Sequence, residues 1–243
     1  MFTYIWHTIF FDPVYNVLVF FVDSVPNGDV GLAIIATVVV VKIFLLPLSI
    51  KVVQTQKMMK ELEPKLKEIK EKFKDKREEQ AAAMMAVYKD AGMNPFANIL
   101  LMFLQIPVLI ALYLAVTRGG GIKLPQINTD ILYSFIPNPD VANVSMNFLK
   151  QIDITQPNLP LALLAGITQY VAIKFSMPDL PPKAADALPN FKDDFARNMQ
   201  LQMKYVMPVM IVFIAHFSAV IGLYFVVSNL MMIAQEIFVR KHR

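Results

Sequence analysis

Residues 30–50 read VGLAIIATVVVVKIFLLPLSI, and Lys42 is the only charged side chain in this stretch. As an α-helix it would be roughly 30 Å long, which matches the hydrocarbon thickness of a bilayer. The surrounding chain of 243 residues is 56% hydrophobic and 17% charged, whereas soluble domains are nearer half apolar and a quarter charged. Lipid rather than water is therefore the expected solvent for most of the chain.

The same composition excludes several classes of protein. Unfolded chains combine low hydrophobicity with high net charge, and this chain is hydrophobic with a formal net charge of only +4. It has no Cys, which excludes disulfides, thiolate nucleophiles and Cys-ligated metals. The GxSxG, HExxH, P-loop and GxGxxG motifs are also missing. We therefore expect no enzymatic activity, no cofactor and no metal site.

Stretches without charge predict four further spans, at 94–117, 159–176, 205–217 and 219–239. The last two come from one charge-free run, 205–235, which as a single helix would extend about 46 Å and must therefore turn back. The turn is expected near 216–222. The predicted fold class is an all-α membrane protein with five transmembrane helices.

The distribution of Lys and Arg predicts the orientation, because cytoplasmic segments are enriched in both. Eleven lie in 51–93, five in 174–204 and three in the tail 240–243, whereas 118–153 holds three. The hairpin 51–93, the loop 177–204 and the tail are therefore expected in the cytoplasm. The N-terminus and the loop 118–158 are expected outside. Because no transit peptide is evident, a bacterial plasma membrane is favoured over an organelle.

Residues 1–29 allow two interpretations. They have no basic region typical of a signal peptide, and Asp12 and Pro13 interrupt the apolar stretch. They form either an amphipathic helix in the outer interface, anchored by Trp6 and Tyr4, or an extra span that begins inside. The prolyl interruption and the lack of positive charge favour the interfacial helix.

The segment 51–93 predicts a cytoplasmic helical hairpin. Apolar residues recur at helical spacing in two stripes, Met58, Leu62, Leu66, Ile69 and Phe73, then Ala81, Met84 and Tyr88. Two antiparallel helices would bury both stripes against each other. Pro64 should kink or restart the first helix, and Gly92 is well placed to end the second.

The charges of this hairpin also allow two interpretations. Eleven basic and eight acidic residues describe a solvated helix pair, whereas a basic excess beside the membrane could attract ribosomal RNA or lipid headgroups. The second interpretation predicts a docking set formed by Lys57, Lys60, Lys65, Lys67, Lys70, Lys72, Lys74, Lys76 and Arg77 of the hairpin, with Arg240, Lys241 and Arg243 of the tail.

Lys42 is the charge that the membrane tolerates least. It lies about 12 Å from the cytoplasmic end of its span at Ile50, and a charge at that depth costs at least about 2.5 kcal/mol. We expect its side chain to face a hydrated cavity; the alternative is a bystander that snorkels to the interface. Other polar residues in the spans more often make hydrogen bonds between helices: Gln105, Thr168, Gln169, Asn229 and Gln235.

A series of motifs resembles the YidC/Oxa1/Alb3 family of membrane protein insertases. The resemblance covers nearly all of 30–239, in order and at the expected spacings, and the absence of a large extracytoplasmic domain is similar to compact bacterial members. The motifs are VVVVKIFLLPLSIKVVQTQKMMKELEPKLKEI, MMAVYKDAGMNPF, LLMFLQIPVLIALY, NFLKQIDITQPNLPLALLAGITQY, MQLQMKYVMPVMIVFI and IGLYFVVSNLMMIAQEIF.

The resemblance implies five helices around a hydrophilic groove that is open to cytoplasm and lipid and closed to the outside. Lys42 stands where the family typically has Arg, Gln169 matches a family groove Gln, and Phe225 stands where many members have Trp. With Gln105, these residues are expected to line the groove. The implied function is insertion of newly made membrane proteins, alone or with a Sec-type translocon, with ribosomes and targeting factors docking on the cytoplasmic face.

Two other classes remain as alternatives. A small-solute transporter would place a midplane site between repeated halves, and no repeat is evident. A scaffold without insertase activity would have no need of a charge within the groove.

Overall fold

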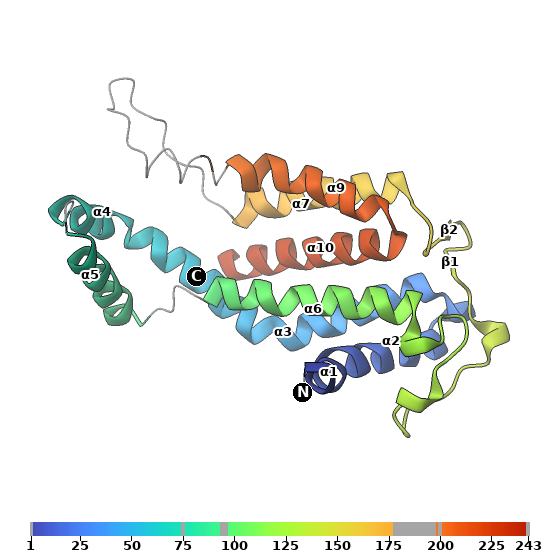
Figure 1. Cartoon of the computed structure of the whole chain (residues 1–243). Helices are drawn as coiled ribbons and strands as arrows, with labels where there is room; N and C mark the ends of the chain where they lie inside the picture. The colour runs from blue at the N-terminus through green and yellow to red at the C-terminus, as the bar shows by residue number, and fades with distance from the viewer. Residues whose placement is uncertain (1, 74–75, 93–96, 177–197, 199–200, 242–243) are drawn as a thin grey trace. The chain divides into compact units, whose positions relative to one another are not determined.

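The computed structural model describes residues 2–73, 76–92, 97–176, 198 and 201–241. The chain forms two compact units: a first unit of Met1–Ile43 with Pro107–Arg243, and a second unit of Phe44–Ile106. Helices make up nearly all the regular structure of each unit (Figure 1). Much of the predicted loop 177–204 lies outside the described residues, as do Lys74, Arg243 and the side chains of Lys57, Lys60, Lys70, Arg77, Arg240 and Lys241.

The apolar helices support the predicted class of an all-α membrane protein. Among the described residues, four helices are long and apolar enough to cross a membrane: Thr3–Ser24, Val30–Thr55, Leu159–Ser176 and Ala219–Val239. Two further apolar helices, Leu104–Thr117 and Gln202–His216, are shorter. The number of helices that actually cross stays a prediction.

Most predicted spans coincide with single helices. Helix α3 (Val30–Glu61) contains the first span and continues beyond Ile50, whereas α6 (Ala97–Thr117) and α7 (Leu159–Ser176) match the second and third. A π-helical segment, η6 (Gln202–Val206), leads into α9 (Met207–His216), and α10 is Ala219–Lys241. The predicted turn near 216–222 is confirmed, because Phe217 and Ser218 separate α9 from α10.

The N-terminal segment is one continuous helix, built from α1 (Phe2–Ile5), η1 (Trp6–Phe11) and α2 (Asp12–Ser24). The interruption expected at Asp12 and Pro13 is therefore wrong. Proline removes a backbone donor and crowds the carbonyl four residues earlier. Here the π-helical turn η1 precedes Pro13, and such a wider turn accommodates the misfit without ending the helix.

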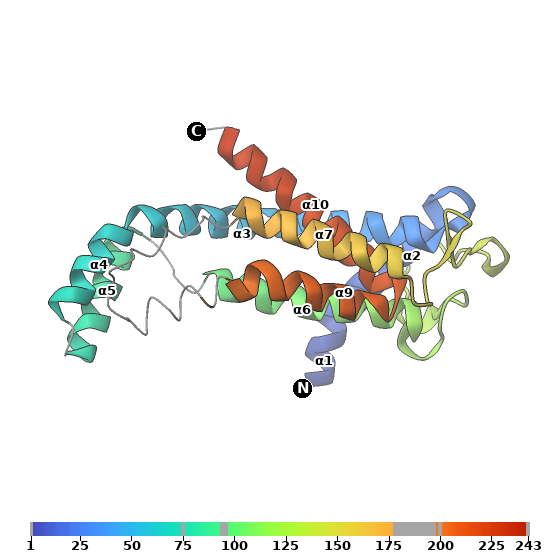
Figure 2. The ribbon, with the colours of Figure 1, turned by 90° about the horizontal axis from the view of Figure 1, so that it is seen from above.

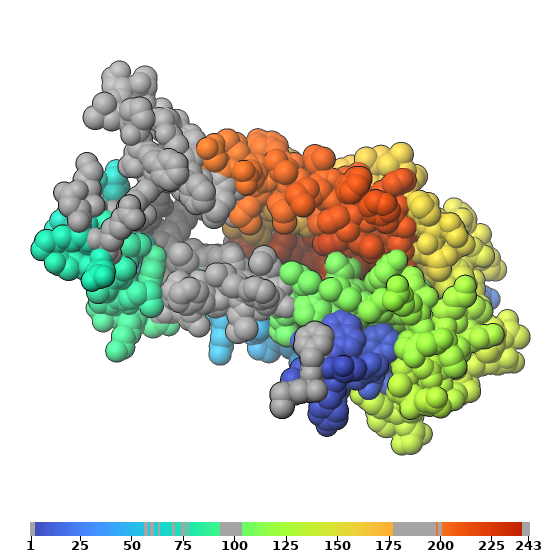
Figure 3. Space-filling view, viewed as in Figure 1, coloured from blue at the N-terminus to red at the C-terminus, as the bar shows by residue number. Residues whose placement is uncertain are grey.

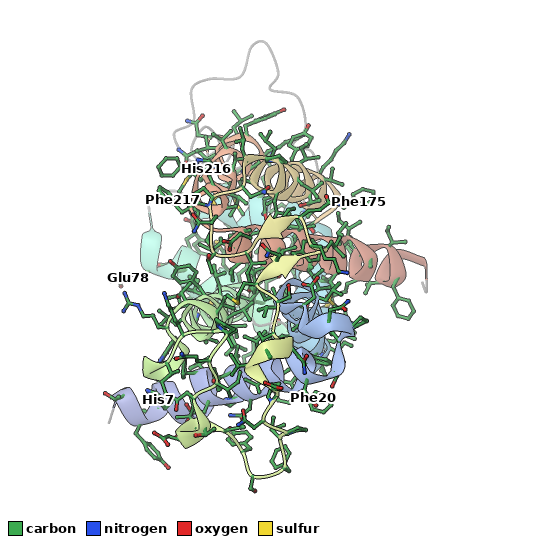
Figure 4. All side chains as sticks on the ribbon, turned by 90° about the vertical axis from the view of Figure 1, so that its right-hand side faces the viewer. His7, Phe20, Glu78, Phe175, His216 and Phe217 are labelled. Atoms are coloured by element: carbon green, nitrogen blue, oxygen red, sulfur yellow. The ribbon has the colours of Figure 1, made fainter. Side chains whose placement is uncertain are left out.

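This N-terminal helix lies across the other helices of the first unit. Figure 2 shows it transverse to α7 and α9, and Figure 4, which looks along those helices, shows it passing from one side to the other beneath them. Its buried residues recur at helical spacing and form one face: Phe11, Val14, Tyr15, Leu18, Val19 and Val22. That face belongs to the main core of the unit, whereas Tyr4, Ile9 and Phe20 are exposed.

Helices α7, α9 and α10 pack closely because two glycines allow their backbones to approach. A Cβ added at Gly166 of α7 would collide with the side chain of Val212, in the middle of α9. It would also lie 3.0 Å from the carbonyl oxygen of Pro208, at the start of α9. A Cβ added at Gly222 of α10 would lie 2.9 Å from Cγ of Leu161 in α7. Small residues at helix contacts are typical of membrane bundles, where association depends on close packing.

The loop between α6 and α7 is ordered by short elements that the sequence did not reveal. It contains the 3-10 turns η3 (Gly119–Gly121), η4 (Thr129–Ile131) and η5 (Val141–Asn143). An antiparallel pair follows, β1 (Asn147–Phe148) and β2 (Ile152–Asp153), with Phe148 opposite Ile152. The loop packs directly on the N-terminal helix at one end of the first unit (Figure 3).

In the second unit, α4 (Glu63–Lys72) and α5 (Arg77–Asp90) pair as predicted. Leu66, Val87 and Tyr88 form a small core, against which Met58, Leu62, Ile69, Met84 and Ala91 pack. Phe73 and Ala81 are not part of this core. The two predicted stripes are therefore correct except for these two end residues. Pro64 restarts the helix after Glu61, and Gly92 follows α5 with a φ of +66°.

Candidate functional site

Lys42 lies on the face of α3 that points into the first unit. The buried residues of α3 recur in adjacent pairs, with Ala33 and Ile34 followed by Thr37 and Val38 one turn later. Continuing this face by one more turn reaches Val41 and Lys42, which are both half-buried. The neighbouring Ile43 is 56% exposed. The charge therefore stands at the inner edge of the helix, on the same side as the core.

Gln169 has the same kind of position on α7. Ala165 and Ile173 lie four residues from it and Ala162 lies seven residues from it on the same helix face, and all three are buried. Gln169 itself is only half-buried. Gln169 is therefore the partly exposed member of an otherwise buried helix face.

The buried face of α10 is polar over two turns. Ser228, Asn229 and Glu236 are between 4% and 7% exposed, and Gln235 is half-buried. Because positions 228 and 229 are seven residues from 235 and 236, these side chains fall on one side of the helix. Burial of so many polar groups in an apolar helix is costly, so they mark an interior surface rather than a lipid-facing one.

One hydrogen-bond pair joins this polar face to α7. The side-chain Nδ2 of Asn229 donates to Thr168 Oγ1 at 3.2 Å and to the Ala165 carbonyl oxygen at 3.3 Å. Thr168 Oγ1 donates in turn to the carbonyl oxygen of Ala165 or Leu164, at 3.0 and 2.9 Å. The pair fixes α7 against α10 immediately beside Gln169.

Three of the four predicted groove residues belong to the first unit, and the fourth belongs to the second. Lys42, Gln169 and Phe225 all belong to the first unit, and Phe225 is half-buried with its ring 5.6 Å from that of Tyr224. No side-chain hydrogen bond or ion pair joins these three within the described part of the chain. Gln105 belongs to the second unit.

The described basic side chains of the hairpin are exposed. Lys65, Lys67, Lys72 and Lys76 all face solvent, Lys76 pairs with Glu79 at 2.9 Å, and Lys72 Nζ lies 5.6 Å from the Phe73 ring centre. A solvated helix pair explains these positions, and a docking surface is compatible with them. Burial raises the pKa of Tyr88, the phenol at the centre of the hairpin core.

The sequence did not reveal the polar residues that tie the N-terminal helix to the loop. Asn16 is 1% exposed; its Nδ2 donates to the Ile131 carbonyl oxygen at 2.8 Å, and its Oδ1 accepts from the Tyr133 N–H at 2.6 Å. The Tyr15 hydroxyl accepts from the Asn128 N–H at 2.7 Å. The one available signal was an Asn within an apolar helix.

The chemistry of these sites is that of binding and positioning. Among the described residues, no three His, Asp or Glu side chains are grouped so that they could hold a metal ion. His7 and Asp12 contact each other at 2.9 Å within the N-terminal helix. Desolvation, followed by the negative charge of Asp12, raises the pKa of Tyr133.

Comparison with known proteins confirms the resemblance. A family model described as 60Kd inner membrane protein matches residues 21–243. The chain is 31% identical to a membrane protein insertase YidC of Alkalihalophilus pseudofirmus over 96% of this chain and 81% of that protein. It is also 31% identical to the YidC proteins of Oceanobacillus iheyensis, over 98% and 84%, and Clostridium tetani, over 91% and 87%. Matches that cover most of both chains show that this chain belongs to the 60Kd inner membrane protein family, the YidC/Oxa1 family.

Proposed function

We propose that this protein inserts newly made membrane proteins into a bacterial plasma membrane and acts by physical means rather than by catalysing a covalent reaction. Its relatives are named membrane protein insertases. The observation that carries the proposal for this chain is the position of Lys42, a charge in an apolar helix that continues the buried face of α3.

The barrier that an insertase must lower is the transfer of the polar flank of a substrate helix. The helix itself is stable in lipid, whereas each charged residue in the flank costs about 2.5 to 3.5 kcal/mol at the bilayer centre. A groove lined by Lys42, Gln169 and Phe225 of the first unit would let that flank travel part of the way in water. The positive charge of Lys42 favours a flank that carries acidic residues.

Short helices would reduce the remaining distance. Gln202–His216 spans about 22 Å as a helix, which is less than the roughly 30 Å of hydrocarbon in an ordinary bilayer. A bilayer thins around a short hydrophobic span at modest cost. The substrate segment would therefore cross a thinner layer beside α9 and then leave sideways into lipid.

The topology and the cytoplasmic partners belong to the same proposal. The excess of Lys and Arg at 51–93 supports a cytoplasmic hairpin and tail, with the N-terminus outside. The transverse orientation of the N-terminal helix and its exposed apolar side chains Tyr4, Ile9 and Phe20 support its placement in the outer interface. Ribosomes and targeting factors are proposed partners of the cytoplasmic face, and a Sec-type translocon is a proposed partner in insertion.

Reconstitution in liposomes tests the function. A short single-span substrate with an acidic N-terminal tail is synthesised in the presence of the purified protein, and protection of the tail from added protease measures insertion. We expect insertion above that of empty liposomes, a clear loss with Lys42→Ala, and retention with Lys42→Arg. Lys174→Ala is the matched control, since Lys174 is an exposed lysine in the last turn of α7. Equal insertion with and without the protein contradicts the proposal.

A further inference from the structure

Residues 133–136, which we term the aromatic turn, present two rings on the surface of the loop between α6 and α7. The Ile136 N–H donates to the Tyr133 carbonyl oxygen at 2.9 Å, so Ser134 and Phe135 occupy the two central positions of the turn. Phe135 is 77% exposed and Tyr133 is 37% exposed, and their ring centres are 5.6 Å apart. Two large rings exposed together on one turn indicate a contact surface.

The aromatic turn is held in place by the N-terminal helix. The Asn16 side chain donates to the Ile131 carbonyl oxygen at 2.8 Å and accepts from the Tyr133 N–H at 2.6 Å. Ile131, Leu132 and Ile136 pack against the main core of the first unit. The backbone is therefore fixed on both sides of the exposed rings, and a surface that is already ordered loses little conformational entropy when it binds a partner.

The sequence around the turn suits the boundary between lipid and water. Residues 131–139 read ILYSFIPNP and carry no charge, whereas Asp130 and Asp140, which flank them, are exposed. Phe and Tyr bury large apolar rings, and the Tyr hydroxyl remains compatible with a wet environment. A turn of this composition can enter the headgroup region without taking a charge out of water.

The loop also extends in the direction in which lipid would be found. In Figure 4, which looks along α7 and α9, part of the loop reaches past the N-terminal helix on the side away from these helices. In Figure 1, where the helices run horizontally, the lowest part of the loop is level with the adjacent ends of α9 and α10 and not beyond them. This part of the loop thus projects sideways from the helices, near their ends.

The neighbouring surface of the N-terminal helix is apolar as well. Tyr4, Ile9 and Phe20 are exposed on this helix, and the loop packs directly against it (Figure 3). The rings of the aromatic turn therefore extend an apolar surface that is already proposed to lie in the outer interface. This continuity favours lipid as the partner of the turn.

We propose that the aromatic turn anchors the loop in the outer leaflet, with Phe135 and Tyr133 at the boundary between the lipid headgroups and the acyl chains. Phe135 supplies the apolar contact, and the Tyr133 hydroxyl stays in the hydrated headgroup region. The proposal rests on the placement of the N-terminal helix in the outer interface. It extends that placement to a loop that the distribution of charges leaves outside the membrane.

Tryptophan fluorescence tests the proposal, because Trp6 is the only Trp in the chain. Phe135→Trp in a Trp6→Phe background moves the fluorescent ring from the helix to the turn, at a residue too exposed for the larger ring to disturb the core. The full chain is reconstituted in phosphatidylcholine and phosphatidylglycerol liposomes that contain lipids brominated either near the headgroup or near the chain end. Iodide on both sides of the membrane measures exposure to water.

We expect lipids brominated near the headgroup to lower the emission of the Phe135→Trp reporter at least about twofold, because interfacial rings lie only about 5 to 10 Å deep. Lipids brominated near the chain end should quench it less, and iodide should quench it weakly. Ala142→Trp in the same background is the matched control, since Ala142 is exposed in the same loop beside the charged Asp140. Its emission should respond to iodide and not to the brominated lipids.

A second reporter, Tyr133→Trp in the Trp6→Phe background, measures the part played by Phe135. Phe135→Ser should weaken quenching of this reporter by the headgroup-brominated lipids, whereas Phe135→Leu keeps an apolar side chain and should retain it. Equal quenching in both variants overturns the role of Phe135 as an anchor.

Strong quenching of the Phe135→Trp reporter by iodide, without quenching by lipid, places the turn in water and overturns the proposal. Protection from both quenchers also overturns it, because a protein surface, such as a second copy of the chain, then covers the ring. The wild-type Trp6 separates this proposal from the one on which it rests. If Trp6 is quenched by the brominated lipids and the turn is not, the anchor alone fails; if neither is quenched, the interfacial placement of the helix fails as well.

Discussion

Asn229 of α10 donates its side-chain amide to the hydroxyl oxygen of Thr168 in α7 at 3.2 Å, and both side chains are buried. This polar contact joins α7 to α10. Gln169 follows Thr168 directly, so the same contact also fixes the direction in which the proposed groove residue points.

A double-mutant cycle measures this contact. Thr168→Val and Asn229→Ala should each destabilise the protein, and their coupling energy should be about 0.6 kcal/mol, with an upper bound near 1.7 kcal/mol, as for other hydrogen bonds between membrane helices. Unfolding in mixed micelles with increasing dodecyl sulfate provides the free energies. Thr168→Ser keeps the hydroxyl and is the control. A coupling energy of zero would show that the two residues are neighbours without a shared bond.

Gly166→Ala should separate α7 from α9. The added methyl group collides with the Val212 side chain and lies 3.0 Å from the Pro208 carbonyl oxygen, which cannot move away without shifting α9. Overpacking of this kind costs about 1 to 3 kcal/mol. Thermal unfolding in detergent measures the loss, and Val212→Ala should restore part of it. An unchanged unfolding temperature for Gly166→Ala would contradict the predicted collision with Val212.

Asn16→Leu should free the N-terminal helix from the loop. The substitution removes the amide that donates to the Ile131 carbonyl oxygen and accepts from the Tyr133 N–H. Both partners lie far from Asn16 in sequence. Each buried backbone group left without a partner costs about 1 to 3 kcal/mol. Hydrogen exchange should become faster at Tyr133 and in the N-terminal helix. Tyr15→Phe removes only the hydroxyl that accepts from the Asn128 N–H, so it should have a smaller effect. Equal exchange in all three proteins would contradict this account.

The hairpin core should open at alkaline pH. Burial raises the pKa of Tyr88 above its ordinary value of 10.0, so the folded hairpin favours the neutral phenol. This contribution to stability is complete below pH 10 and is lost as the pH rises through the folded pKa. Limited proteolysis within 51–93 should therefore increase at high pH in the wild type and less in Tyr88→Phe. The Tyr133→Phe variant should behave like the wild type, because Tyr133 lies in the first unit.

Much of the fold could be predicted from the sequence because hydrocarbon imposes simple rules. A helix in lipid must be long, apolar and nearly free of charge, so the ends of α7 and the turn after His216 follow from the positions of charged and polar residues. Lys42 was recognisable for the same reason, as one charge in an apolar run. The hairpin stripes were readable because helical spacing brings residues three and four apart onto one face.

The rest could not be predicted because it depends on long-range contacts. Asp29 and Leu149 are bonded across 120 residues of sequence, and no periodic pattern marks either of them. The π-helical turn before Pro13 is a local adjustment that helical propensities do not anticipate. Gln105 belongs to the second unit and the other proposed groove residues to the first, and spacing along the chain did not indicate this division.

The central claim is that the charge of Lys42 acts on the substrate. Reversing this charge and measuring insertion in liposomes tests the claim most directly. Insertion is measured for a single-span substrate whose tail carries Asp residues and for a matched substrate whose tail carries Lys at the same positions. Lys42→Glu should lower insertion of the acidic tail about tenfold or more, because attraction at a low-dielectric site becomes repulsion, and should raise insertion of the basic tail. Lys174→Glu should change neither. If Lys42→Glu inserts both tails at the wild-type rate, the side chain does not act on the substrate and the account is contradicted.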